Sequence, residues 1–98
     1  MAPTIASTTA AAASAVTEMG KDIRVSIVNS ASKDAYPIAG FTYILLYKHQ
    51  TDAAKGKALV SFLKWAIHDG QQYAKKLYYA PLPAAVVKLN DAALKSVN

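Results

Sequence analysis

Apolar residues recur along the chain with two different periods, and each period predicts a type of element. From Ala53 onward the apolar positions return every three to four residues, which is typical of an amphipathic helix. This stripe comprises Ala58, Leu59, Phe62, Leu63, Ala66 and Ile67. The opposite face carries Lys57, Ser61, Lys64 and His68. Thr51 or Asp52 can cap the helix start, and we expect Phe62 and Leu63 at the centre of its buried face.

Helices are also expected at both ends of the chain. The segment from Thr4 to Met19 is rich in alanine, with Pro3 marking its start and Gly20 its end. Its apolar face can pack closely but buries little area. A further helical stretch is expected over residues 71–77. The last helix begins after Pro83 and gathers on one side Val86, Val87, Leu89, Ala93, Leu94 and Val97.

Two segments alternate with the period of a β-strand. The short one, Ile23–Val28, alternates apolar and more polar positions. The long one, Tyr36–Tyr47, is apolar on both faces, which is typical of an interior strand covered on both sides. Pro37 cannot donate a ladder hydrogen bond and therefore fits the start of that strand. The sequence predicts an α/β chain that is mostly helical, with one long and one short strand.

The long strand raises the question of what it pairs with, because two strands alone are marginally stable in water. An open apolar strand edge is a template for pairing with another chain. We therefore expect a homodimer or higher oligomer, with the first helix or the long strand in the contact. The alternative is that the short strand and the helices close a small monomeric core.

Charge and composition narrow the function classes. The 98 residues carry a formal charge of +5, and ten of the eleven basic residues are lysines, with Arg24 the one arginine. The lysines are scattered, and lysine lacks the bidentate geometry with which arginine reads bases and phosphates. We expect a solvated basic surface and no nucleic-acid binding. The chain has no cysteine and no apolar run of the roughly 18 residues that a membrane helix needs, so we expect no membrane insertion.

No catalytic or metal-binding constellation is evident. His49 and His68 are the two histidines, and no acidic or second histidine ligand has metal-binding spacing near them, so both are expected to be solvated. Neither a G-x-S-x-G elbow nor a phosphate loop is present, and Gly56 lies in an exposed helix start. The tyrosines and Trp65 are expected in the core rather than on a stacking platform. We expect no enzyme, no metal and no cofactor.

Several stretches of the chain resemble the C-terminal end of bacterial periplasmic phosphate-binding proteins, the receptors of the phosphate ABC transporter. They are YPIAGFTYILLYK, DAAKGKALVSFLKWAIHDGQQYAKKLYYAPLP and the closing VVKLNDAAL. The resemblance covers roughly residues 33–94. The alanine-rich start also looks like the helix that precedes this region in the family.

The resemblance implies a piece of a two-lobed periplasmic-binding-protein fold that closes around one phosphate ion. Residues 1–35 would belong to the second lobe and the crossover, and residues 36–98 to the strand and helices of the first lobe. Tyr36, Pro37, Ile38 and Ala39 match the position where the chain crosses the hinge. The missing partners of the long strand would then lie in other parts of the receptor.

The resemblance also limits what the chain does alone. Its implied partners, in the full-length parent, are inorganic phosphate and the ABC permease, and its implied location is the periplasm. The family's R-x-x-x-S-G-T loop, which supplies ion-binding residues, is absent here. No ligand residue can be transferred, and the chain by itself is expected not to bind phosphate. The alternative function is that of a small basic helical adaptor.

Overall fold

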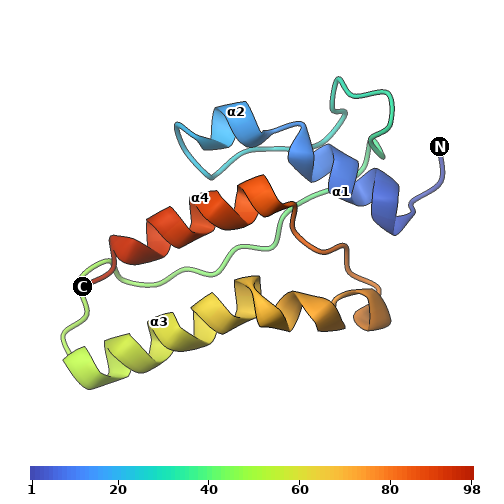
Figure 1. Cartoon of the computed structure of the whole chain (residues 1–98). Helices are drawn as coiled ribbons and strands as arrows, with labels where there is room; N and C mark the ends of the chain where they lie inside the picture. Colours follow the sequence, from blue (N-terminus) through green and yellow to red (C-terminus); the bar gives the residue numbers. More distant parts are fainter.

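Helices account for about half of the chain, and no β-strand forms. The computed structural model describes all 98 residues (Figure 1). In chain order the elements are α1 (Ile5–Ala13), α2 (Val16–Met19), α3 (Ala53–Ile67), the 3-10 helices η1 (Asp69–Tyr73) and η2 (Lys75–Leu77), and α4 (Ala84–Lys95). The expected helices are therefore present, with the stretch after α3 folded as two tight 3-10 turns.

The alanine-rich start is two helices rather than the single expected one. It begins where expected, because Thr4 and Ser7 form a reciprocal capping box. It breaks at Ser14, whose hydroxyl donates a hydrogen bond of 2.7 Å to the carbonyl of Ala11. A serine hydroxyl that bonds its own backbone competes with regular helix geometry. Helix α2 then restarts at Val16.

Helix α3 begins at the predicted cap. The Asp52 carboxylate accepts a hydrogen bond of 3.1 Å from the amide of Lys55. Gly56 is buried rather than exposed, because the side chain of Gln50 folds over it. A Cβ atom at this position would lie 2.8 Å from Cβ of Gln50, closer than real contacts allow. Glycine therefore permits the tight approach between the helix start and the preceding loop.

The predicted centre of the α3 stripe is half right. Leu63 is 6% exposed, but Phe62 is 59% exposed and stacks on Trp65 with ring centroids 6.1 Å apart. Helix α3 packs against α4, so only the side that faces α4 is buried. Phe62 lies on the edge of the stripe and faces no other element.

Helix α4 is the central element of the fold, because it contacts α1, α2 and α3. Val86 in its first turn is 1% exposed. The core around it consists of Ala11, Ala12, Ala15, Met19, Ile27, Ala35 and Val86. The small alanine side chains of the N-terminal helices let α4 approach closely, as the sequence indicated. No helix of the chain is long and apolar enough to cross a bilayer.

Neither predicted strand forms. Residues 38–47 run extended beside α4 but make no backbone-to-backbone hydrogen bond. Leu45 is 93% and Ile44 62% exposed, so the expectation of cover on both faces is also wrong for this chain. Both results have the same reason: no other backbone segment pairs with either edge of residues 38–47.

The short segment keeps the alternation of a strand without the ladder. Ile27 is buried, Ile23 and Val25 are half-buried, and residues 24, 26 and 28 are exposed. The apolar positions pack on the core beneath α1 and α4. The period of two therefore reflects one-sided burial of an extended chain and does not require a sheet.

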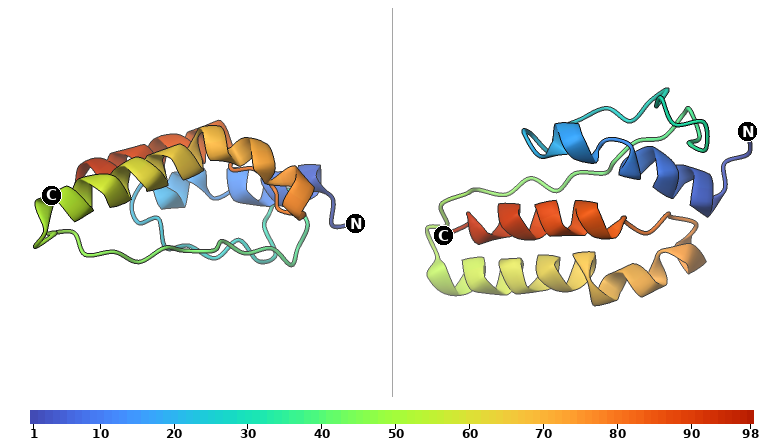
Figure 2. Two further views of the ribbon diagram at one scale, coloured as in Figure 1. Left: turned by 90° about the horizontal axis from the view of Figure 1, so that it is seen from below. Right: turned by 45° about the horizontal axis from the view of Figure 1, so that its top comes forward.

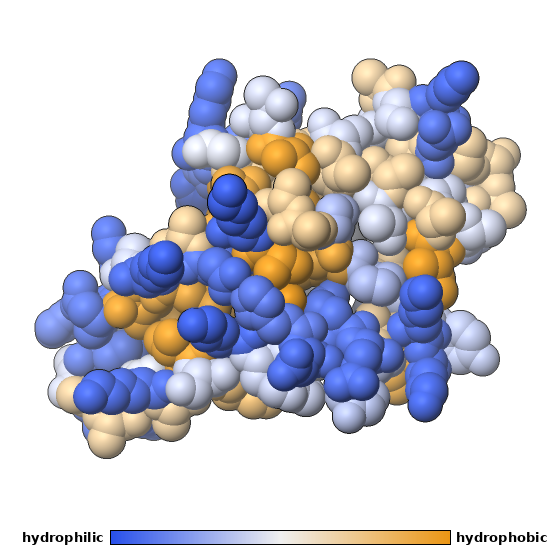
Figure 3. Space-filling view, in the orientation of Figure 1, coloured by the Kyte–Doolittle hydropathy of each residue, from blue (hydrophilic) through white to orange (hydrophobic).

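The molecule is a thin slab with one layer of helices and the extended segments along one face (Figure 2, left). It measures 46 × 30 × 17 Å, and its radius of gyration is 14.4 Å. A compact domain of this length has a radius of gyration of about 13 Å. In the view of Figure 3, hydrophilic side chains project around the surface and leave apolar areas open between them. Only one side of the helix layer is covered, and the extended segments provide that cover.

A pair of substitutions in α3 tests this burial pattern. We expect Leu63→Ala to lower the free energy of unfolding by about 2–5 kcal/mol, because it empties a packed position. Phe62→Ala should cost clearly less, since most of the ring already contacts water. Thermal unfolding followed by circular dichroism measures both variants. Equal losses in the two variants would contradict the observed orientation of α3.

Candidate functional site

The residues expected at the hinge lie between α1 and the extended segment. The amide of Tyr36 donates a hydrogen bond of 3.0 Å to the carbonyl of Ser7 in α1. The carbonyl of Pro37 accepts a bond of 2.7 Å from the amide of Asn29. Asn29 has a φ of 51°, in the left-handed region that asparagine tolerates. The first two hinge candidates are thus fixed to two neighbouring parts of the chain.

The next two hinge candidates differ from each other in burial. Ile38 is 75% exposed, while Ala39 is half-buried and packs on the core. Both lie in the part of the chain that makes no backbone-to-backbone hydrogen bond. Among the four candidates, the backbone of Tyr36 and Pro37 is therefore anchored by hydrogen bonds to other backbone, whereas that of Ile38 and Ala39 is not.

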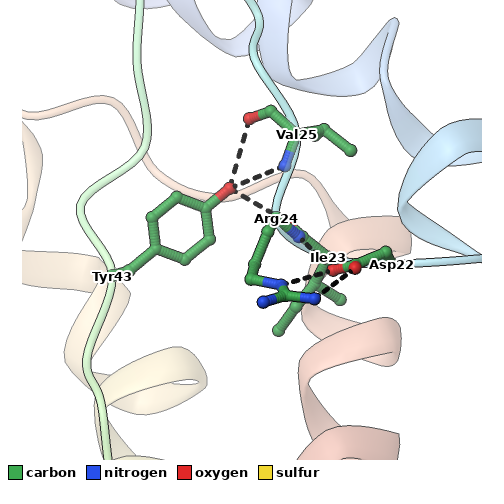
Figure 4. Close-up of polar contacts among 5 residues, drawn as sticks. All are labelled: Asp22, Ile23, Arg24, Val25 and Tyr43. Atoms are coloured by element: carbon green, nitrogen blue, oxygen red, sulfur yellow. Dashed lines mark hydrogen bonds and ion pairs between the residues drawn. The ribbon is translucent and has the colours of Figure 1, made fainter.

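Tyr43 links the two extended segments beyond this point (Figure 4). Its hydroxyl lies 2.9 Å from the carbonyl oxygen of Ile23, and 3.2 Å from both the amide nitrogen and the carbonyl oxygen of Val25. The hydroxyl can accept from the amide and donate its one proton to either carbonyl. Tyr43 was expected in the core with the other tyrosines. The contact could not be predicted, because nothing in the local pattern marks residues 18 to 20 positions away as its partners.

Asp22 and Arg24 form a compact ion pair beside this contact (Figure 4). Nε and Nη2 of Arg24 donate to the two carboxylate oxygens at 3.0 and 2.7 Å, and the Arg24 amide donates to Oδ1 at 2.9 Å. Hydrogen bonds from the Arg24 side chain and amide lower the pKa of Asp22 to about 2, and the carboxylate raises the pKa of Arg24. The one arginine of the chain is therefore already engaged by a carboxylate.

Other places that could hold an anion are occupied or incomplete. Helix N-termini attract anions, but the Thr4 hydroxyl caps α1 and the Asp52 carboxylate caps α3. Helix α4 begins without a side-chain cap at Pro83, and a single helix start is too little to hold a dehydrated phosphate. The described contacts bring no set of cationic side chains together.

An apolar crevice of about 200 Å³ lies between the extended segment and the helices. Phe41, Leu63 and Val86 are among its lining residues. No charged side chain lines it, and burying an unpaired charge is very costly. The crevice is therefore unsuited to phosphate, and it marks incomplete packing under the extended chain.

Both histidines are exposed, as expected, but each has a partner. Nε2 of His68 lies 2.8 and 2.9 Å from the carboxylate oxygens of Asp91 in α4. Nδ1 of His49 lies 2.9 Å from Oδ1 of Asn98. These contacts join segments far apart in sequence, so no spacing rule could reveal them. Three metal-binding side chains do not gather anywhere in the chain.

The expectation that the aromatic residues form the core is wrong for most of them. Tyr36 is half-buried. The exposed ones are Tyr43, Tyr47, Phe62, Trp65, Tyr73, Tyr78 and Tyr79. Their spacing in the sequence is typical of core residues, but the thin molecule has no second layer of helices or sheet to cover them. Exposure here reflects missing cover and gives no stacking platform with convergent basic groups.

The ion pair leads to a prediction about pH. The Asp22 carboxyl should titrate with a midpoint near pH 2, below its ordinary pKa of 3.8. Because the folded-state pKa is lowered, the stabilisation by this pair is present above pH 3.8 and is lost as the pH falls through 2. The carboxyl carbon shift in NMR follows this titration. Arg24→Gln should raise the midpoint but leave it below 3.8, because the amide of residue 24 still donates to the carboxylate. An unchanged midpoint would show that the guanidinium is not the cause.

Comparison with known proteins identifies the relatives of this chain. No family model matches it. The phosphate-binding protein PstS of Xylella fastidiosa is 39% identical over 90 residues, which cover 92% of this chain and 25% of that protein. PstS of Pasteurella multocida is 33% identical over 94 residues, covering 96% of this chain and 27% of that protein. PstS of Haemophilus influenzae is 35% identical over 63 residues, covering 64% and 19%.

The chain spans about a quarter of the length of the curated relatives it matches. The relatives are named as binding proteins and not as enzymes, in agreement with the absence of a catalytic constellation from the sequence. They also favour a receptor over a small basic adaptor. The resemblance deduced from the motifs is confirmed: this chain belongs to the family of bacterial phosphate-binding proteins and corresponds to one segment of them.

Proposed function

We propose that the chain is part of a periplasmic receptor that binds inorganic phosphate and delivers it to an ABC permease. The observation that carries this proposal is the 39% identity over 92% of the chain to a protein named for phosphate binding. The relatives are about four times longer, since the match covers 25% of their length. The chain would therefore supply one portion of a receptor whose other portions complete the ligand site.

In that receptor, residues 1–35 would belong to the second lobe and the crossover, and residues 36–98 to the first lobe. The proposed boundary lies just before Tyr36, whose amide bonds to the carbonyl of Ser7 in α1, and the extended segment follows it. The hinge role of Tyr36, Pro37, Ile38 and Ala39 is supported by the change from an anchored to an unanchored backbone within these four residues.

Residues 38–47 would be a strand of the α/β fold of the complete receptor. Three features support this role: the segment is extended, it contains no charged residue, and its backbone makes no hydrogen bond to other backbone. Neighbouring strands from the rest of the receptor would supply the ladder and cover Leu45 and Ile44, which are exposed here.

We also propose that the isolated chain associates with itself through the same open segment. Two copies of residues 38–47 can pair antiparallel about a two-fold axis. The segment itself carries no charge. The lysine that follows it, Lys48, would lie at opposite ends of an antiparallel pair, so the two copies would not repel each other there. The pairing would satisfy exposed backbone groups and cover Leu45 and Tyr47.

The isolated chain should not bind phosphate tightly. A receptor must replace the water around the anion with many convergent donors, whereas Arg24 is paired and the starts of α1 and α3 are capped. We expect no binding tighter than about millimolar, where general attraction to a +5 surface dominates. Titration calorimetry at physiological salt measures this, with full-length PstS of Xylella fastidiosa as the positive control. A saturable micromolar site in the chain alone would refute this expectation.

Light scattering after size exclusion tests self-association. We expect a dimer or larger species at micromolar concentration, and Leu45→Lys should shift it to monomer by placing two charges in the paired edge. Leu77→Lys is the matched control, because Leu77 is also exposed, at 64%, but lies in η2 away from the open segment. A stable monomer of the unmodified chain, or equal effects of the two variants, would count against pairing through residues 38–47.

A further inference from the structure

Two extended segments, residues 23–29 and 37–43, run antiparallel with a gap between their backbones. They are joined directly at one place, where the amide of Asn29 donates to the carbonyl of Pro37 at 2.7 Å. Counting away from this pair in an antiparallel register places Val25 opposite Phe41 and Ile23 opposite Tyr43. No backbone-to-backbone hydrogen bond connects either of these opposed pairs.

The hydroxyl of Tyr43 occupies the place where the missing bonds would form. It lies within 2.9 to 3.2 Å of the carbonyls of Ile23 and Val25 and of the Val25 amide. A single side chain therefore contacts three backbone groups of the first segment, two of which, the Val25 amide and the Ile23 carbonyl, also bond to each other at 3.1 Å. Figure 4 shows the ring reaching from the ribbon of one segment to the backbone of the other.

The orientation of the Tyr43 ring is fixed by packing, although the ring is not buried. It packs edge-on against Phe41, with ring centroids 6.0 Å apart and an angle of 66° between the planes. The residue is 43% exposed. Loss of the hydroxyl alone would therefore leave the packing in place and remove only the polar link between the segments.

We propose that Tyr43 is a positioning residue that sets the separation of the two connecting segments through its hydroxyl. The hydroxyl is the only polar link from residues 38–43 to the first extended segment. Without it, the pair is joined at Asn29 and Pro37 alone, so the segments are free to spread or to shift. As a role in a hinge this rests on the proposed receptor function, since the same two segments would connect the lobes there.

Amide hydrogen exchange of Tyr43→Phe tests the link in the 98-residue chain. The Val25 amide should exchange about 2- to 5-fold faster, because it loses the Tyr43 hydroxyl but keeps the Ile23 carbonyl, at 3.1 Å, as a second acceptor. The Asn29 amide, which bonds to Pro37, should keep its protection. Tyr47→Phe is the matched control, because Tyr47 is 84% exposed and its hydroxyl makes no hydrogen bond within the chain. Unchanged exchange at Val25 would overturn the proposal.

A second measurement separates positioning from general stability. The chain has no cysteine, so spin labels can be placed at Lys21→Cys and Leu45→Cys, both at exposed positions. An excess of unlabelled chain ensures that only distances within one copy are measured. Tyr43→Phe should broaden the distance distribution between the labels, while Tyr47→Phe should leave it unchanged. An unchanged distribution, or equal loss of protection at Val25, Asn29 and throughout α4, would show that Tyr43 only supports the fold. Neither readout involves phosphate, so this outcome is independent of the receptor assignment.

Discussion

The packing of α4 against the alanine face of the N-terminal helices is the contact on which the rest of the structure depends. Val86 is the most deeply buried of the large side chains, and α1, α2 and α3 all reach α4. Small side chains allow this close approach but contribute little apolar area each. Ten of 98 residues are buried, so the fold is thin and relies on a few contacts that cannot be replaced.

The thin core explains the state of the extended segments. Residues 38–47 lie on one face of the helix layer, where no further chain supplies hydrogen bonds or apolar cover. The main chain there makes no hydrogen bond to other backbone, and side chains such as Leu45 and Tyr47 remain exposed. Individual side-chain contacts then join the segments in place of the backbone hydrogen bonds of a sheet. The hydroxyl of Tyr43 is the clearest case. Such a link holds two segments at a distance without making them rigid.

The charges of the chain are arranged for structure rather than for anion capture. Asp22 neutralises Arg24, Asp52 caps α3, and Asp91 pairs with His68. Lysines supply the net positive charge but project separately from the surface. Phosphate recognition requires donors that converge on one point, and in the proposed receptor these come from portions of the protein beyond this chain.

The sequence by itself determined the helices, the cap at Asp52, the apolar side of α4 and the family, because these depend on local spacing and on contiguous motifs. Alternation at residues 23–28 correctly predicted which side chains turn inward. Only the tertiary structure decided that no strand forms, that Phe62 is exposed, and that Tyr43 and His68 find distant partners. The physical reason is that a strand or a buried face forms only when another segment packs beside it, and the sequence of one segment does not say whether such a neighbour is present.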